Sequence, residues 1–242
     1  MSSWGWVSGC LLGWFLIVGF GLLRGRGRLA FVAGLLVASS DSLRCILARS
    51  SGLEPAWWWG SSGLTWPVAV RWLLALSYLS WAVWPFILVG CGASVRCFVA
   101  TSLVTVTAAV LSWVVPVAPP WMVGMPRSVE GLPVLGALVL NDVSPATAFP
   151  SVHVAIPFVL ALVAGSWRWS VYGAVVAVVV VLAGEHWLVD VAGGVVLALA
   201  VWAAMIAGYE LRRRAGPGRR GRIWSRHNLT AKWGRMRKGV AG

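Results

Sequence analysis

Long apolar runs recur from one end of this chain to the other, and they constrain its fold more than any other feature. A helix needs about 20 consecutive apolar residues to cross the core of a bilayer, which is about 30 Å thick. Hydrophobic residues make up 59% of the sequence and charged residues 11%, which excludes a disordered chain and a water-soluble domain. The sequence therefore predicts an all-α transmembrane helix bundle of six to seven spans. The candidate spans cover residues 4–23, 29–48, 66–90, 95–115, 151–166, 170–185 and 188–209.

The basic residues lie unevenly around these runs. Sixteen of the 20 lysines and arginines fall on one side of the predicted membrane, and two to four fall on the other. Basic residues concentrate on the cytoplasmic side of membrane proteins, so we expect a multi-pass cell-membrane protein with its N-terminus outside and its C-terminal tail in the cytoplasm. Although the net charge is +13, the placement of the basic residues at span ends indicates topology and not nucleic-acid binding.

The runs and charges divide the chain into two regions. Residues 1–211 form the predicted membrane domain, and residues 212–242 form a basic cytoplasmic tail with eleven basic residues. We expect this tail to bind anionic lipid headgroups, since each basic residue near such a surface contributes about 1 kcal/mol. The longest outer connection, residues 116–148, contains the apolar segment Leu132–Leu140, which is too short to span and is expected to lie along the membrane interface.

Two of the three histidines lie where apolar runs meet the outer side. His153 stands at the start of the fifth run, just after Pro150 and Ser151, and His186 stands between the sixth and seventh runs. One helical hairpin joins the two positions, so both histidines reach the same membrane depth. Ionisable residues are costly at such a depth and are therefore functional by default. The sequence predicts an active site on the extracytoplasmic face.

The spacing of the polar residues favours binding of a phosphate group. Asp190 follows His186 by four residues, so a helix places both on one face and the carboxylate can orient the imidazole. Pro150 suits the first turn of a helix, whose free amides would face an anion, and Ser151 adds a hydroxyl there. A phosphate between these groups would have His153 on one side and His186 on the other.

The same cluster has a second interpretation as a metal site. Besides the two histidines, Glu185 and Asp190 offer carboxylate ligands that a transition metal accepts. The HExxH spacing is absent, and nothing in the pattern requires a metal. We therefore predict a site that works without a metal or another cofactor.

Two stretches resemble motifs of the type-2 phosphatidic acid phosphatase superfamily. They are Phe149-Pro-Ser-Val-His153 and Gly184-Glu-His-Trp-Leu-Val-Asp-Val-Ala-Gly193, which look like its second and third motifs. The closer likeness, shared by the loop around Pro119-Pro120-Trp121, is to the branch that includes inositol-phosphorylceramide-synthase-like proteins. The resemblance implies that the membrane domain is phosphatase-like, with its motifs within residues 116–194.

The resemblance also implies a role for each matching residue. His186 would be the nucleophile that forms a phosphohistidine, and Asp190 would orient it. His153 would be the general acid for the leaving group. Ser151 would help to hold the phosphoryl oxygens.

The chain departs from the family pattern where positive charge is expected. The third motif of the family commonly has Ser-Arg ahead of the histidine, and Val179 and Val180 stand there in this chain. The Lys and Arg of the first motif are also missing before Pro119 and Pro120. A phosphoryl transition state spreads negative charge over its oxygens, so we expect Arg127 to be the best-placed substitute that binds phosphate. The further candidates on the outer side are Arg44, Arg49 and Arg71.

These features predict an enzyme that transfers a phosphoryl group from a lipid phosphate or from a prenyl phosphate or pyrophosphate. With water as the acceptor it would be a phosphatase, and with an alcohol it would be a phospholipid headgroup transferase. Because the motif arginine is missing, an inactive, degenerate member of the family is a further alternative. A non-enzymatic transporter or scaffold that uses the His/Asp cluster as a proton relay is the alternative from another class.

Overall fold

A computed structural model of the 242-residue chain describes residues 65–79, 95–127, 132 and 147–214. In this part of the chain every regular element is helical and no strand occurs, which confirms the all-α expectation there. The predicted spans at 4–23 and 29–48, residues 80–90 of the predicted span 66–90, and residues 215–242 of the tail lie outside the described residues. The elements are α3 (Val68–Leu79), α5 (Val95–Val114), the 3-10 helix η2 (Pro120–Val123), α7 (Val152–Ala164), α8 (Trp167–Leu182) and α9 (Leu188–Arg214).

The described helices lie within or close to the apolar runs that predicted them. α5 covers the fourth run almost completely, and α9 continues past the predicted domain boundary at residue 211 to Arg214. These two helices are long and apolar enough to cross a membrane. With 13 and 16 residues, α7 and α8 are about 20 and 24 Å long and fall short of a bilayer core. The described residues thus contain two helices of spanning length, and the total of six to seven spans stays a prediction.

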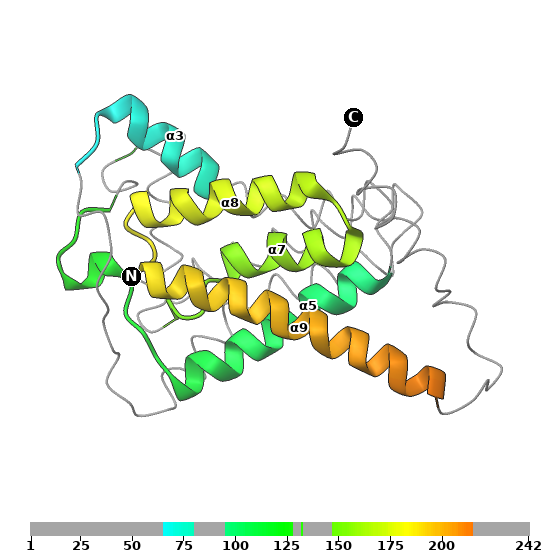
Figure 1. Cartoon of the computed structure of the whole chain (residues 1–242). Helices are drawn as coiled ribbons and strands as arrows, with labels where there is room; N and C mark the ends of the chain where they lie inside the picture. The colour runs from blue at the N-terminus through cyan, green and yellow to red at the C-terminus, as the bar shows by residue number, and fades with distance from the viewer. Residues whose placement is uncertain (1–64, 80–94, 128–131, 133–146, 215–242) are drawn as a thin grey trace, which may run out of the picture.

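α7 is the central helix of the bundle (Figure 1). It packs against α5, α8 and α9, and α3 packs against α8. Its apolar side chains enter two buried clusters, one shared with α5 and α9 and the other with α3 and α8. Ala100 and Ala108 of α5 and Ala155 of α7 are fully buried, and such small residues let helix backbones approach closely.

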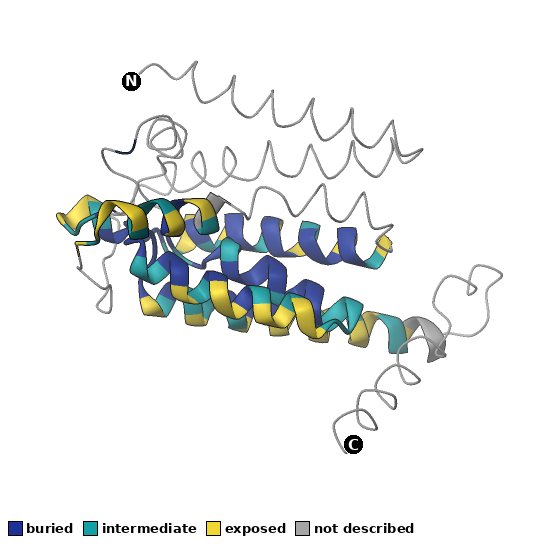
Figure 2. Cartoon of the chain, turned by 90° about the horizontal axis from the view of Figure 1, so that it is seen from above, coloured by how far each residue is buried: buried dark blue, intermediate teal, exposed yellow. Residues whose placement is uncertain are grey.

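The direction of the chain brings four helix ends together at one end of the bundle. α5 and α8 end there, and α7 and α9 begin there (Figure 1). We call this the site end. The opposite end holds the short turn between α7 and α8, and α9 projects beyond that turn with residues that are mostly half-buried or exposed (Figure 2).

The connection between α5 and α7 is described in part. Its first segment, residues 115–127, contains η2 and pairs with the end of the connection, where the amide of Ala148 donates a 3.0 Å hydrogen bond to the carbonyl oxygen of Val117. Of the predicted interfacial segment, only Leu132 is described, and it is buried in the cluster of α3, α7 and α8. The interfacial position of that segment stays a prediction.

Candidate active site

The turn between α8 and α9 carries His186 and has a closely defined backbone. Gly184 adopts the left-handed conformation (φ 74°), which favours glycine. The amides of Glu185 and His186 both donate to the carbonyl oxygen of Val180, at 3.0 and 3.1 Å. A Cβ atom on Gly184 would collide with the carbonyl oxygen of Pro126. The turn is therefore closed by its own hydrogen bonds and lies directly against a second backbone segment.

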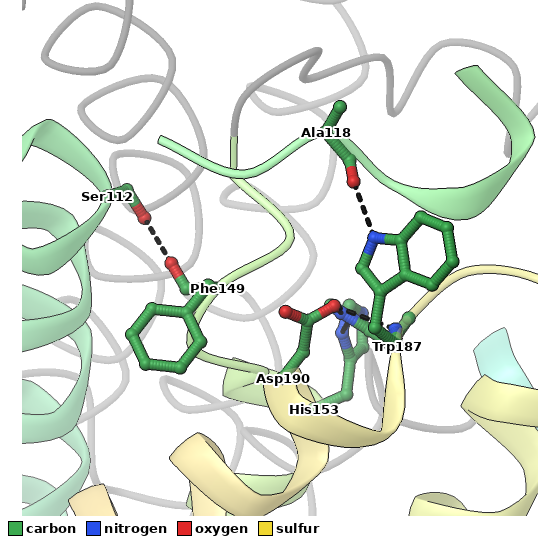
Figure 3. A network of polar contacts seen from close by, with 7 residues as sticks. Ser112, Ala118, Phe149, His153, Trp187 and Asp190 are labelled. Atoms are coloured by element: carbon green, nitrogen blue, oxygen red, sulfur yellow. Dashed lines mark hydrogen bonds and ion pairs between the residues drawn. The ribbon is translucent and has the colours of Figure 1, made fainter. Parts of the chain in front are cut away.

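Asp190 lies in the first turn of α9 and contacts both the start of that helix and His186. Its Oδ2 atom accepts a 2.8 Å hydrogen bond from the backbone amide of Trp187, the residue before the helix (Figure 3). An acidic residue at the third helical position commonly satisfies a free amide in this way. The same oxygen lies 3.5 Å from Nδ1 of His186, which is longer than a hydrogen bond. The predicted pair is therefore adjacent, and the helix start fixes the carboxylate.

The two histidines contact each other directly. Nδ1 of His153, in the first turn of α7, lies 3.1 Å from Nε2 of His186, and the rings meet edge to face. Because Nδ1 of His186 faces the carboxylate of Asp190, we assign the lone pair to its Nε2 atom and the donated hydrogen to His153. The sequence-based prediction of a phosphate between the two rings does not fit this arrangement, since a 3.1 Å contact leaves no room. The rings must separate to admit one.

Ser151 lies beside the histidines at the N-terminus of α7. It is fully buried, and its Oγ atom has no hydrogen-bond partner in the described part of the chain. Its amide donates a 3.0 Å hydrogen bond to the carbonyl oxygen of Asp190, which ties the start of α7 to the start of α9. Pro150 precedes this N-cap residue and so lies outside the first helical turn in which the sequence placed it. A buried hydroxyl and the first-turn amides of α7 are thus together at the site.

Arg127 forms a buried ion pair with Glu185. Its Nε atom and one terminal nitrogen donate to the two carboxylate oxygens at 2.8 and 2.9 Å, and the side chains are 3% and 4% exposed. The guanidinium carbon also lies 4.6 Å from the centroid of the Trp121 ring, over its face. The predicted phosphate ligand therefore contacts the residue next to His186, and its role in binding phosphate stays a prediction.

Glu185 is one of the candidate ligands in the metal interpretation. Both oxygens of its carboxylate are instead bonded to Arg127. Among the described residues, no group of three or more His, Cys, Asp or Glu side chains is placed to hold a metal ion.

The sequence did not predict the bonds that attach the His186 turn to the segment after α5. The indole nitrogen of Trp187 donates a 2.7 Å hydrogen bond to the carbonyl oxygen of Ala118, 69 positions away in the sequence (Figure 3). Trp187 is 1% exposed and packs with Val117 and Ala148 in a small cluster at the site end. The position of Trp187 next to His186 was the one sequence feature that pointed to a role at the site. No periodicity in the sequence links Trp187 to Ala118, because they are too far apart.

The family of the chain follows from its match to a known family model. The model described as the PAP2 superfamily matches residues 49–204, which is more than half of the 242 residues. The chain belongs to the PAP2 superfamily. No curated protein and no solved structure matches it.

Members of the PAP2 superfamily are phosphatases or phosphotransferases. The match confirms the superfamily predicted from residues 149–153 and 184–193, while the inositol-phosphorylceramide-synthase-like branch stays a prediction. The matched range contains the whole polar cluster of this PAP2 protein. The match supports a phosphatase-type function for the chain, and the roles of the individual residues in the cluster stay predictions.

Proposed function

We propose that this PAP2 protein is an integral-membrane phosphatase that removes the phosphate of a lipid phosphate on the extracytoplasmic face of the cell membrane. The proposal depends on one observation, the row of three side chains at the site end. Nε2 of His186 lies 3.1 Å from Nδ1 of His153, and Nδ1 of His186 lies 3.5 Å from Oδ2 of Asp190. A carboxylate that faces one imidazole nitrogen favours the tautomer that has its lone pair on the other, and an approach of Oδ2 closer than the observed 3.5 Å would complete the hydrogen bond. This leaves Nε2 of His186 suited to attack phosphorus.

In the first step the substrate phosphorus replaces His153 at Nε2 of His186. The lone pair of Nε2 forms a P–N bond while the P–O bond to the leaving group breaks, and protonated His153 gives its proton to the departing oxygen. His153 is half-buried and His186 is buried, so the ring that must move is the less enclosed of the two.

The second step releases inorganic phosphate and restores the enzyme. Neutral His153 takes a proton from water, the water oxygen forms a P–O bond, and the P–N bond breaks so that the lone pair returns to His186. Each turnover starts with one neutral and one protonated histidine. We therefore expect a bell-shaped dependence of the turnover rate on pH. The rate falls at low pH, where both histidines carry a proton, and at high pH, where neither does.

The phosphoryl oxygens require hydrogen-bond donors and positive charge. The buried hydroxyl of Ser151 and the first-turn amides of α7 are donors of this kind, and they adjoin His153. Protonated His153 supplies a positive charge. Arg127, paired with Glu185, is the sequence-based candidate for a second one.

The distribution of exposed apolar and basic residues supports the proposed orientation. Large apolar side chains are exposed on α5, α8 and α9, as expected for helices that face lipid. Arg96, Arg168 and the C-terminus of α9 are at the end opposite the site (Figure 1). Such an arrangement is expected of a bundle of six to seven spans whose site faces outward and whose basic end faces the cytoplasm.

Phosphate release by the purified protein tests the proposed reaction. With phosphatidic acid or prenyl pyrophosphate in detergent micelles, we expect release of inorganic phosphate that a chelator does not reduce. Loss of release with the chelator would favour the metal site, and transfer to an added alcohol would indicate a headgroup transferase. If no lipid phosphate is turned over while proteoliposomes conduct protons, the proton-relay interpretation replaces the phosphatase.

Thiol labelling in intact cells tests the orientation. A cysteine in place of Met122, which is 44% exposed in η2, is expected to react with a membrane-impermeant reagent, whereas one in place of Ser225 in the tail is not. Labelling in the reverse sense would place the site in the cytoplasm. The background must first lose its native cysteines, Cys10, Cys45, Cys91 and Cys97.

A further inference from the structure

The segment after α5 contacts both chain segments that carry histidines. Its Val117 carbonyl accepts a hydrogen bond from Ala148, just before α7, and its Ala118 carbonyl accepts one from Trp187, just before α9. At the far end of the same segment, Arg127 binds Glu185. One stretch of chain thus joins the two segments whose imidazoles meet at 3.1 Å.

Of the three attachments made by this segment, the Arg127–Glu185 pair is the one formed by charged side chains. It is bidentate, almost fully buried and covered by the Trp121 ring. A charge-assisted pair of this geometry fixes the relative position of its two backbones. If Arg127 left the pair to bind a substrate phosphate, the Glu185 carboxylate would become an uncompensated buried charge next to the negative phosphate. Such a buried charge is strongly unfavourable, so the arginine gains little by exchanging partners.

Glu185 is also coupled to His186 through the backbone. The two residues are adjacent, and their amides share the carbonyl oxygen of Val180. A displacement of Glu185 would therefore move the imidazole of His186 relative to His153. Displacements of about 1 Å at reacting groups can reduce a rate by about 10²-fold.

We propose that Arg127 and Glu185 are positioning residues and not phosphate ligands. Their ion pair holds the His186 turn against the segment after α5, and so sets the distance between the two imidazoles. This proposal rests on the proposed function and changes the role that the sequence predicted for Arg127. The positive charge near the phosphate then comes from protonated His153, and the first-turn amides of α7 donate hydrogen bonds to the phosphate oxygens.

A double variant separates positioning from phosphate binding. Single substitutions leave one buried charge without its partner, and their yield is expected to fall. Arg127→Met/Glu185→Leu removes both charges and keeps similar side-chain volumes, so this variant is expected to fold. Arg168→Met, at an exposed position at the opposite end of the bundle, is the control for loss of an arginine.

Steady-state kinetics with inorganic phosphate as a competitive inhibitor is the first measurement. We expect the double variant to lose about 10- to 100-fold in kcat, while KM and the inhibition constant of phosphate change less than about twofold. The control variant Arg168→Met is expected to match the parental protein in kcat, in KM and in the inhibition constant of phosphate. A rise of about tenfold or more in KM and in the inhibition constant would show that Arg127 binds phosphate and overturn the proposal. An unchanged kcat would overturn it as well.

Chemical labelling of His186 is the second measurement, and it does not depend on turnover. His186 is 5% exposed, and diethyl pyrocarbonate modifies accessible imidazoles. Mass spectrometry of the peptide that contains His186 is expected to show several-fold more labelling in the double variant than in the parental protein or the control. Equal labelling would contradict positioning by the ion pair. If the parental protein released no phosphate from any lipid, the proposed function would fail, and this labelling would still test the ion pair separately.

Discussion

Two turns connect α7, α8 and α9, and they differ greatly although each contains a left-handed glycine. Gly165 (φ 58°) lies in the turn between α7 and α8, and Gly184 (φ 74°) lies in the turn between α8 and α9. The first turn is half-buried and leads into the exposed Trp167, whereas the second is buried at every residue from Ala183 to Trp187. Similar local chemistry therefore produces two very different environments.

The contacts from outside the hairpin account for the difference. At Gly165, the described hydrogen bonds are local, such as the one from its amide to the carbonyl oxygen of Ala161. The second turn also contacts residues far away in the sequence, including the carbonyl oxygens of Pro126 and Ala118. Local hydrogen bonds suffice to form a helical hairpin. A turn that positions a nucleophile is, in addition, fixed by segments from elsewhere in the chain.

The Asp190→Asn variant is expected to show the largest effect of the substitutions that test this comparison. Asparagine keeps an oxygen for the Trp187 amide and so preserves the start of α9, but it removes the charge beside His186. We expect kcat to fall about 10²- to 10⁴-fold with a nearly unchanged thermal midpoint. Ser166→Ala, at the N-cap of α8 in the other turn, has no side-chain capping bond and is the control. A parental rate in Asp190→Asn would contradict the role of Asp190 in orienting His186 and would leave it only the role of capping α9.

His153→Ala is expected to show an effect that depends on the leaving group. The general acid matters most when the departing oxygen is a poor leaving group, so turnover of a lipid phosphate should fall about 10²-fold. An activated aryl phosphate needs no proton, and its turnover should fall much less. Parallel rate measurements with the two substrates provide the test. Equal losses with both would contradict the role of His153 as the acid.

Matched alanine substitutions at Gly165 and Gly184 compare the two turns directly. Each places a side chain in the left-handed region, which costs about 1 kcal/mol of folding free energy. At Gly184 the new Cβ also collides with the Pro126 carbonyl oxygen and must displace the His186 turn. Thermal unfolding and turnover are expected to show a small stability loss with full activity for Gly165→Ala, and a larger stability loss with reduced kcat for Gly184→Ala. Equal losses of stability and of kcat in the two variants would mean that the contacts from distant segments do not fix the second turn.

Deletion of residues 216–242 is expected to show the smallest effect. These residues follow the end of α9 at Arg214, and α9 ends far from the site (Figure 1). We expect unchanged specific activity in micelles and weaker binding of the protein to anionic lipid. A large loss of turnover in a normally inserted protein would contradict the division into a membrane domain and a basic tail.

The positions of the helices and the convergence of the histidines could be predicted because they depend on local patterns. Apolar runs set the approximate extent of α5, α7, α8 and α9. A single hairpin between His153 and His186 brings both to the same end, whatever the details of packing. The four-residue spacing from His186 to Asp190 predicted that both lie on one helix face, but α9 begins at Leu188, so His186 lies in the turn before the helix. The path of this turn brings the imidazole to 3.5 Å from the carboxylate.

The tertiary contacts within the site could not be predicted in this way. Arg127 and Glu185 are 58 positions apart, and nothing in the sequence around either residue indicates its partner. The direct imidazole contact depends on how closely α7 approaches the turn after α8, which is set by buried residues of several helices. The hydrogen bond from Ser151 to the Asp190 carbonyl oxygen is of the same kind.

The most direct test of the central claim is to trap the covalent intermediate on His186. The protein is mixed with a lipid phosphate labelled with radioactive phosphorus and quenched in alkali, where phosphohistidine is stable, and the labelled peptide is identified by mass spectrometry. We expect the label on the peptide that contains His186 in the parental protein, and no label and no turnover in His186→Ala. Label on another residue, or a stably inserted His186→Ala that still releases phosphate at the parental rate, would contradict the account.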